Sequence, residues 1–561
     1  MRIRSFVLGV ICLFSLHLAL LGQPGASEQQ SVQRVERWDT AQFSFVSARA
    51  LANPFRDLSL QATFSHADGR QITVSGFYDG GATWRIRFMP LEIGRWDYTT
   101  KSNDPALDGK RGAIDCIAPQ KSYLHGPLHS EGLHFRHADG TRRFLISTRL
   151  SCQSAPASVW DKVIPFLQKN RINRVLFMMV GIHGQAKGLY GQGGADLWSY
   201  NVEKFQAIDG FIDALRRADI VVSPYFYYFN DRFQRKLTPE QDEAFLRYGM
   251  ARFGAYANVM PVLANEVEQK FSERAQAKYD PRDHQWANRF GKLLEELAVF
   301  KVPIAVHNPM ESFEARNPGF FTLLQDWPFP WADFMLRQMQ VGALGSAPAL
   351  ADDVPEPTDP TWNARAFARH NDLLLRLRRF NVPIINEEPG YEMEGTRSWN
   401  GQTSPTVRAT FWTAAMAGAY TMWGNPATYE LGDPVPYMER SRTPSDLRLM
   451  GDVMDRVPYW EMEPHNELIN ANMVEVCGEE YRRNFLLART GRHYLVYSRD
   501  GGTIEMTTDP GEYELESILL NDVPAAYTIV RPKGRLTAKD GKVSFFLSAA
   551  MDWVAILRKV E

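Results

Sequence analysis

The chain has 561 residues, of which 44% are hydrophobic and 23% are charged, an ordinary globular composition with room for several domains. Its net charge of −2 provides no basic excess for binding nucleic acid or an anionic membrane surface, so neither is expected as a partner. The composition leaves oligomeric state open.

The first 27 residues have the three parts of a secretory signal peptide. Arg2 and Arg4 precede an apolar run over residues 6–21, and small residues follow it up to Ser27. We therefore expect a cleaved leader and a secreted or periplasmic protein, and no later segment is long and apolar enough to span a bilayer. Three cysteines remain after the leader, at positions 116, 152 and 477, so at most one disulfide forms.

Residues 28–125 consist of short alternating runs broken by Gly, Asp and Asn, which predicts an antiparallel β-sandwich. Four strings mark this region: NPFRD at 53–57, GFYDG at 76–80, RFMP at 87–90 and GRWDY at 94–98. They resemble a domain of unknown function that precedes many bacterial glycosidase barrels. The resemblance implies architecture and no chemistry.

A predicted hairpin at 125–142 bridges the first domain and the next, which covers residues 126–465. The rest of this second region alternates strands and helices, the pattern of βα units around a parallel sheet. Eight candidate strands begin at Phe144, Arg174, Ile220, Val259, Val302, Phe320, Val382 and Gly418. Eight is the number that closes a (β/α)8 TIM barrel, so we predict an α/β protein built around one.

Two of these apolar strands end in acids. The segment Val259–Glu266 ends in Asn265 and Glu266, and the segment Val382–Glu388 ends in Glu387 and Glu388. Carboxyl ends of parallel strands meet at the barrel mouth, where barrel enzymes keep their chemistry. Two carboxyl groups at one mouth are what glycoside hydrolysis requires.

Counting strands places Glu266 after the fourth and Glu388 after the seventh. This arrangement, with Asn before the first acid, resembles clan A retaining glycoside hydrolases, and the string EPGYE at 388–392 resembles apiosidase-like glycosidases. The resemblance implies that Glu266 is the acid/base and Glu388 the nucleophile. Some apiosidase-like relatives carry Asp at the strand-four position, so apiosidase activity itself is not transferred.

The tandem acids leave an ambiguity, because adjacent strand residues point to opposite faces. Only one of Glu387 and Glu388 enters the mouth unless the strand has already ended. Glu388 aligns with the EP motif and is the preferred nucleophile, and Glu387 remains the other candidate for that role.

Residues at the strand ends supply the neutral donors, acceptors and aromatic faces that a hydroxyl-rich ligand needs. Arg149, which ends the first strand, is expected to hold Glu388 ionised. The candidate substrate-binding residues are Asn265, Glu387, His183, Tyr227, Asn230, His307, Asn308, Asp326, Trp327, Tyr391, Trp423 and Arg149.

Two insertions rich in Gly or Pro, at 188–200 and 345–362, are predicted to be mouth loops. Residues 466–561 return to an alternating pattern and predict a second β-sandwich, similar to the collagen-binding-like β domain that ends many apiosidase-like chains.

The leading hypothesis is a glycoside hydrolase acting on a poly- or oligosaccharide without a cofactor. A second hypothesis, a glycan-binding or scaffold protein on an inactive barrel, keeps the aromatic residues but makes no demand on Glu266. A third, a metal-dependent barrel hydrolase, is disfavoured because the first strand ends in STRLSC, without the histidine pair that such a site uses.

Overall fold

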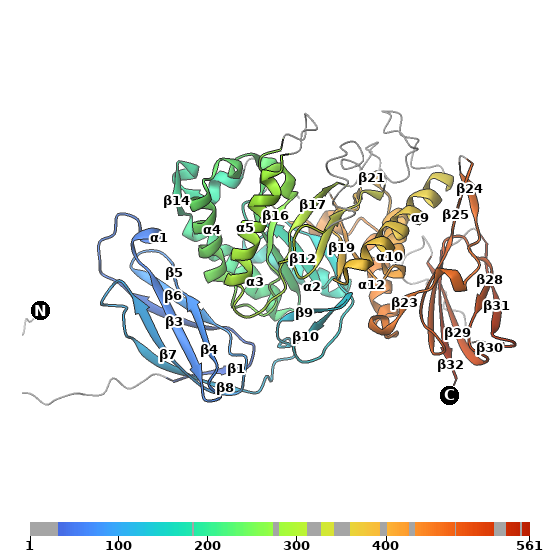
Figure 1. Cartoon of the computed structure of the whole chain (residues 1–561), viewed down its shortest axis with the longest axis horizontal. Coiled ribbons are helices and arrows are strands. Elements are labelled where there is room, and N and C mark those ends of the chain that lie inside the picture. The colour runs from blue at the N-terminus through green and yellow to red at the C-terminus, as the bar shows by residue number, and fades with distance from the viewer. Residues whose placement is uncertain are drawn as a thin grey trace, which may run out of the picture.

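The computed structural model describes residues 32–181, 185–272, 280–310, 327–341, 360–392, 401–425, 432–476, 478–520, 534–549 and 552–560. Three parts follow one another along the long axis (Figure 1): a β domain, a barrel wrapped in helices, and a second β domain. Within these ranges, no helix combines the length and the apolar character that crossing a membrane requires.

The N-terminal domain is a sandwich of two sheets, with strand orders β1-β8-β7-β3-β4 and β2-β6-β5. Its elements are β1 (Val32–Glu36), β2 (Ala41–Val46), α1 (Pro54–Asp57), β3 (Leu60–His66), β4 (Gln71–Ser75), β5 (Phe77–Tyr78), β6 (Thr83–Phe88), β7 (Gly94–Ser102) and β8 (Arg111–Ile117). Alternate residues of β3 are buried, as the period of two predicts. The two sheets meet where Phe64 stacks on Phe88 with ring centroids 3.8 Å apart.

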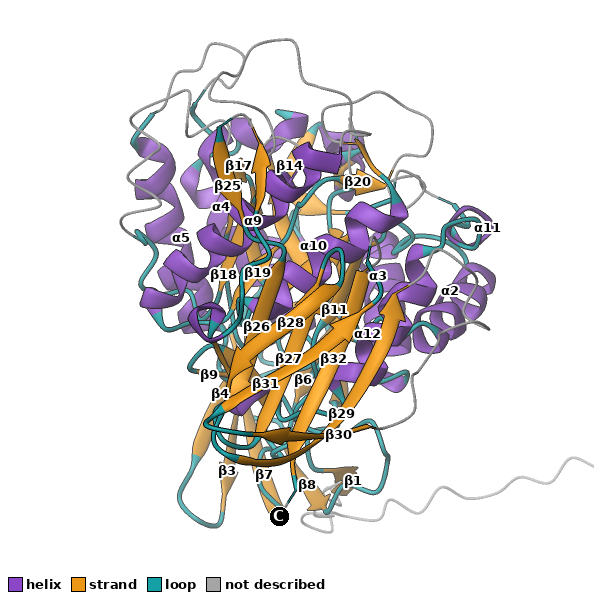
Figure 2. Ribbon diagram, turned by 90° about the vertical axis from the view of Figure 1, so that its right-hand side faces the viewer, coloured by secondary structure: helices purple, strands orange, loops and turns teal. Residues whose placement is uncertain are grey.

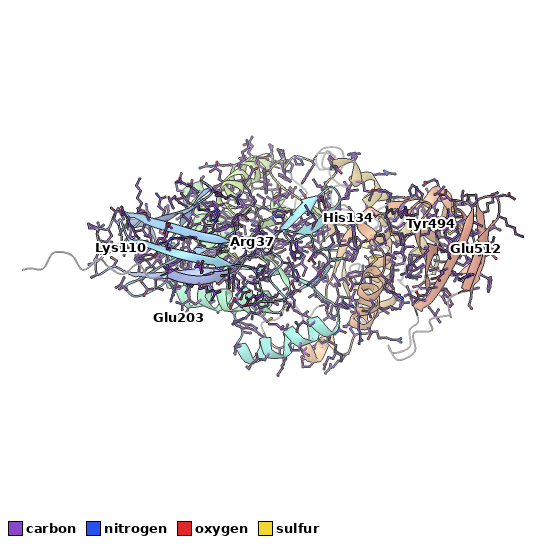
Figure 3. The ribbon with its side chains drawn as sticks, turned by 90° about the horizontal axis from the view of Figure 1, so that it is seen from below. Arg37, Lys110, His134, Glu203, Tyr494 and Glu512 are labelled. Carbon is purple, nitrogen blue, oxygen red and sulfur yellow. The ribbon has the colours of Figure 1, made fainter. Side chains whose placement is uncertain are left out.

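An antiparallel hairpin, β9 (Leu128–Glu131) and β10 (His134–His137), connects this sandwich to the barrel. His134 is buried, and its Nδ1 lies 3.0 Å from the hydroxyl of Tyr420 in a barrel strand. Figure 3 shows His134 between the two flanking domains. The predicted hairpin at 125–142 is therefore confirmed.

Eight parallel strands form the barrel, in the order β16-β15-β12-β11-β22-β19-β18-β17. They are β11 (Ile146–Arg149), β12 (Arg174–Met178), β15 (Val221–Tyr228), β16 (Val262–Asn265), β17 (His307–Met310), β18 (Met335–Gln338), β19 (Ile384–Asn386) and β22 (Tyr420–Trp423). The barrel closes between β16 and β17, where the Leu263 N–H donates to the Ala305 carbonyl at 2.8 Å. The TIM barrel is thus confirmed, as are the flanking β domains.

Helices cover the outside of the barrel: α2 (Ala157–Lys169), α3 (Val202–Arg217), α4 (Pro239–Phe253), α5 (Arg282–Leu297), α9 (Pro360–Leu377), α10 (Ser404–Met416), α11 (Val435–Met438) and α12 (Thr443–Met454). Helix α4 begins with a capping box between Thr238 and Gln241, which satisfies two backbone donors. In α5, Phe290, Leu293 and Leu294 are buried, as their helical spacing predicts.

The sixth barrel strand differs from the prediction, which placed it at Phe320–Trp327. It is β18, Met335–Gln338, which pairs with β17 and β19. Trp327 therefore precedes the strand, and its ring packs edge-on against Phe380 at 6.2 Å. The strand was missed because Arg337 and Gln338 interrupt its apolar character.

The C-terminal domain has a main sheet in the order β23-β26-β27-β32-β29-β30, and Figure 2 shows its strands from the C-terminal side. Its strands are β23 (Glu463–Pro464), β24 (Val474–Val476), β25 (Glu479–Tyr481), β26 (Asn484–Arg489), β27 (His493–Ser498), β28 (Gly502–Thr507), β29 (Gly511–Leu520), β30 (Gly534–Ala538), β31 (Lys542–Leu547) and β32 (Asp552–Lys559). Strands β28 and β31 pair separately. Arg408 of α10 contacts Asp552 of β32 at 3.2 Å, which ties the domain to the barrel.

Candidate active site

The candidate acids follow strands β16 and β19, the fourth and seventh of the barrel in chain order. Glu266 comes directly after β16, and Glu387 and Glu388 come directly after β19. Because all eight strands are parallel, both positions lie at the carboxyl end of the barrel.

Glu266 is 2% exposed and has a left-handed backbone with φ of 41°. A residue with a Cβ is uncommon in this region, and its cost is borne by surrounding contacts. The Oε2 atom accepts hydrogen bonds from Gln269 Nε2 at 2.8 Å and from the Asn230 side-chain amide. Asn265 Nδ2 lies 3.4 Å from the same oxygen. The carboxyl group is therefore held by neutral amides.

His307, at the start of β17, fixes the Glu266 peptide from the other side. The Glu266 backbone N–H donates to His307 Nδ1 at 3.3 Å. Burial, and then the nearby arginines 149, 337 and 174, lower the pKa of His307 to about 3. The ring is therefore neutral near pH 7, with its hydrogen on Nε2. Among the described residues this buried Nε2 has no hydrogen-bond partner, so it is placed to donate to a ligand.

The two adjacent acids after β19 have different surroundings. Glu387 is 2% exposed, and both its oxygens bind the Arg174 guanidinium at 2.8 Å, while the Tyr225 hydroxyl donates to Oε1 at 2.7 Å. Arg174 also reaches Ser223 Oγ at 3.1 Å. The sequence nominated Glu387 as a substrate-binding residue. In the structure its carboxylate forms a buried ion pair with Arg174 inside the barrel.

Glu388 is only partly buried, and the Tyr391 hydroxyl donates to its Oε1. The Tyr391 ring can approach because position 424 is glycine: a Cβ there would lie 2.6 Å from the ring. The strand ends at Asn386, so the alternation of side chains no longer holds at Glu388.

Tyr228, the last residue of β15, is influenced electrostatically by both candidate catalytic acids. Its phenol hydrogen-bonds with Arg149 and interacts electrostatically with both Glu266 and Glu388. Burial, opposed by Arg149 and reinforced by the two acids, raises the pKa of Tyr228 to about 12. The phenol is thus neutral near pH 7, and its charge would be opposed by both carboxylates.

Asn308, next to His307, is 1% exposed and donates from Nδ2 to Glu268 Oε1 at 2.9 Å. Several other residues that the sequence nominated do reach the acids. Asn230, Asn265 and His307 contact Glu266, Tyr391 contacts Glu388, and Arg149 hydrogen-bonds with Tyr228.

Other nominated residues lie elsewhere. The Tyr227 ring packs edge-on against Trp286 of α5 at 5.0 Å, and its hydroxyl donates to the Asp242 carbonyl at 2.7 Å. Trp423 is fully buried, and its Nε1 donates to Glu392 Oε2 at 2.7 Å, so it offers no platform for a sugar. Trp327 precedes strand six rather than following it.

His183 and Asp326 lie outside the described residues.

Sequence reasoning missed Tyr228, Gln338 and Gln340. Gln338 and Gln340 are 1% and 4% exposed, and their Oε1 atoms have no hydrogen-bond partner among the described residues. Met335 packs outward in the apolar cluster that also contains Leu374 and Leu377 of α9, so alternation along β18 turns Gln338 inward. Gln340 lies two residues beyond the end of the strand. The signal that could have found the two glutamines is their spacing of two residues in the string MLRQMQ at 335–340.

Among the described residues, no three His, Cys, Asp or Glu side chains group in a way that could hold a metal ion. Cys116 and Cys152 are both free and buried.

Comparisons with known proteins agree with this architecture. Residues 34–103 match a domain of unknown function (DUF5060), and residues 173–435 match the apiosidase-like catalytic domain. A comparison with curated proteins gives no match.

Solved structures are similar over most of the chain. A candidate glycoside hydrolase from Bacteroides vulgatus ATCC 8482 aligns with a TM-score of 0.70 and 19% identity over 94% of this chain and 100% of that chain. A glycoside hydrolase family 5 protein from the same organism aligns with a TM-score of 0.55 and 14% identity, over 78% and 94% respectively. At these identities the likeness is one of fold. On the match to the apiosidase-like catalytic domain the chain is a glycosidase, with a carbohydrate substrate, and its TIM barrel follows a domain of unknown function.

Proposed function

We propose that the protein is a secreted retaining glycoside hydrolase acting on a poly- or oligosaccharide, with Glu266 as acid/base and Glu388 as nucleophile. The observation that carries this proposal is the position of the two acids, which directly follow the fourth and seventh parallel strands at the carboxyl end of one barrel. A pair of carboxyl groups across one glycosidic bond is the apparatus of glycoside hydrolysis.

In the first step, protonated Glu266 gives its proton to the glycosidic oxygen while the Glu388 carboxylate attacks the anomeric carbon. The bond to the leaving group breaks, and a glycosyl ester forms on Glu388. In the second step, the Glu266 carboxylate takes a proton from water, and the resulting attack on the anomeric carbon releases Glu388. Two inversions give a product of retained configuration.

The surroundings of the acids suit these two roles. The Tyr391 hydroxyl donates to Glu388, which orients the carboxylate for attack. The amides of Gln269 and Asn230 donate to Glu266, which holds this carboxyl group in position.

Neutral polar atoms around the acids suit a hydroxyl-rich ligand. The buried Nε2–H of His307 can donate to a sugar hydroxyl, and the Oε1 atoms of Gln338 and Gln340 can accept from one. Buried polar atoms without a protein partner are costly unless a ligand or water satisfies them. We therefore assign these three side chains to sugar binding, in place of Tyr227, Trp327 and Trp423.

Secretion is supported by the basic and apolar character of residues 1–27. Expression of the full-length chain in a bacterial host, followed by N-terminal sequencing of the mature protein, tests it. A new N-terminus between Gly22 and Ser27 is expected, and an intact Met1 on the exported protein would contradict cleavage.

The catalytic assignment is tested with a panel of plant and bacterial polysaccharides and aryl glycosides. Wild type, Glu388→Ala and the exposed control Gln71→Ala are compared on every substrate that wild type cleaves. We expect Gln71→Ala to match wild type and Glu388→Ala to release no product. Normal turnover by Glu388→Ala would overturn the assignment, and binding of a glycan without hydrolysis by wild type would favour the scaffold hypothesis.

A further inference from the structure

The N-terminal sandwich is fixed to the barrel by a buried ion network. Arg87 of β6 donates two hydrogen bonds to Asp209 of α3, from Nη1 to Oδ1 at 2.7 Å and from Nη2 to Oδ2 at 2.9 Å. Arg252 of α4 binds the same Asp209 and also reaches Asp79 of the sandwich at 2.9 Å. All four side chains are at least 89% buried. Breaking such a network leaves an unpaired charge in the interior, so the two domains behave as one body.

Helix α1 of the sandwich and its N-cap residue also contact a hairpin of the barrel. This hairpin is formed by β13 (Tyr190–Gly191) and β14 (Asp196–Tyr200). Asn53 Nδ2 donates to the Trp198 carbonyl at 3.1 Å, and the Arg56 guanidinium lies 3.9 Å from the centre of the Trp198 ring. Figure 1 shows α1 on the side of the blue domain that faces β14.

Phe55, between these two residues, enters an aromatic cluster shared by both domains. Its ring meets Tyr78 of the sandwich, Tyr200 of the hairpin and Tyr248 of α4 edge-on, at 5.1, 5.1 and 5.3 Å. The Tyr248 hydroxyl also donates to the Tyr78 carbonyl at 2.9 Å. The segment Asn53–Arg56 thus contacts the hairpin by a hydrogen bond, a cation–π contact and ring packing.

On its other side, the hairpin contacts the end of the third barrel strand. Tyr190 pairs with Tyr200 across the hairpin, and its hydroxyl accepts a hydrogen bond from Gln234 Nε2 at 3.1 Å. Gln234 is fully buried, and its Oε1 accepts from the Tyr228 backbone N–H at 2.8 Å. The Ala186 N–H, just before the hairpin, donates to Asp231 at 3.0 Å.

The strand end held in this way carries two residues of the site. Asn230 donates to Glu266, and the phenol of Tyr228 is influenced electrostatically by both acids. An unbroken series of packed contacts therefore runs from the N-terminal domain through the hairpin and Gln234 to the acid/base.

We propose that the N-terminal sandwich is a positioning element of the active site: by holding the β13–β14 hairpin it keeps Tyr228 and Asn230 in register with Glu266. This assigns a role to the domain of unknown function that requires no ligand of its own. The proposal rests on the proposed function, because it takes Glu266 to be the proton donor.

The test uses the leaving group. A misplaced acid fails to protonate a poor leaving group but matters little for an activated aryl leaving group, which departs without a proton. Destabilisation alone lowers the amount of active protein, and so lowers the rate on both substrates by the same factor. The ratio of the two kcat values therefore separates misplacement from unfolding.

The variants are Arg56→Ala, whose side chain is exposed, and Phe55→Ala in the full-length protein, with Phe55→Tyr as the conservative form and Arg95→Ala as the control. Arg95 lies on the same domain in an exposed pair with Asp97. Each variant is assayed on an unactivated glycan and on a dinitrophenyl glycoside that wild type cleaves. Arg56→Ala and Phe55→Ala should lower the rate on the glycan relative to the aryl glycoside by about 10-fold, within the range that small misplacements cost. Phe55→Tyr and Arg95→Ala should keep the wild-type ratio.

Equal losses on both substrates, or no loss in either variant, would overturn the positioning role. Glu266→Ala serves as the reference: if it also leaves the ratio unchanged, the proposed function fails rather than this inference. If Glu266→Ala shifts the ratio and the two domain variants do not, only this inference fails.

Discussion

Arg174 and Glu387 form a two-point ion pair inside the barrel, with both contacts at 2.8 Å and neither side chain more than 2% exposed. The pair lies where TIM barrels usually keep branched apolar side chains. It supports the proposal that Glu388 is the nucleophile, because both oxygens of Glu387 are already bound by a guanidinium.

Glu387→Ala should destabilise the protein by about 3–5 kcal/mol, because it leaves the Arg174 charge buried without its partner. Glu388→Ala should change stability far less, because Glu388 is only partly buried. Chemical unfolding of both variants measures the difference. Should Glu387→Ala retain wild-type stability and lose all activity, the nucleophile is Glu387.

Glu266→Ala should keep appreciable activity on an aryl glycoside and lose it on the natural glycan. Added azide should restore its turnover, because a small anion attacks the glycosyl ester without general-base help. The measurement is the rate with and without azide, followed by identification of a glycosyl azide of retained configuration. Failure of azide to accelerate Glu266→Ala would argue against Glu266 as the general base.

Gln340→Ala should lower kcat/KM by roughly 3- to 10-fold, the cost of losing one hydrogen bond to a neutral partner. Its Oε1 is buried without a hydrogen-bond partner among the described residues, so under the proposed assignment removing it deprives a sugar hydroxyl of an acceptor. Steady-state kinetics on a cleaved aryl glycoside check this, with the exposed Gln71→Ala as control. A kcat/KM equal to that of wild type would remove Gln340 from the sugar site.

His370 should make stability depend on pH. It lies between Thr413 Oγ1 at 3.0 Å and Asn386 Nδ2 at 2.9 Å, and burial lowers its pKa from 6.5 to about 3. As pH falls below about 6.5, the unfolded chain binds a proton that the folded protein refuses, so stability present above this pH is lost toward pH 3.

The His370→Gln variant should lack this loss. Between pH 7 and pH 4.5 wild type should lose about 2–3 kcal/mol more than the variant, since one proton contributes about 1.4 kcal/mol per pH unit. Unfolding free energies of both proteins at the two pH values provide the test. Parallel pH profiles would show that His370 is protonated in the folded state.

The sequence was informative where apolar strands end abruptly in polar residues. The segments ending in Glu266 and Glu388 kept this pattern, because their strands are buried on both faces and only their ends reach the mouth. Strand β18 broke it, because Arg337 and Gln338 occupy buried positions that are usually apolar. The prediction therefore placed strand six at an apolar run upstream, Phe320–Trp327, and so placed Trp327 at the end of a barrel strand.

Side-chain partners could not be predicted from strand ends alone. Tyr227 and Tyr228 are adjacent and chemically identical, yet Tyr228 hydrogen-bonds with Arg149, while Tyr227 packs against α5. Trp423 ends a barrel strand, but a buried carboxylate, Glu392, captures its indole N–H. Such choices depend on tertiary packing between segments far apart in the chain.

The central claim is that Glu388 forms a covalent bond with the sugar, and trapping that intermediate tests it most directly. A 2-deoxy-2-fluoro glycoside of the cleaved sugar, with an activated leaving group, should inactivate the enzyme. The fluorine slows both formation and breakdown of the ester, and the good leaving group restores the rate of formation alone, so the ester accumulates. Mass spectrometry should find one added fluorosugar on the tryptic peptide Phe380–Arg397, and fragmentation should place it on Glu388. A label on Glu387, or inverted product with no adduct, would contradict the account.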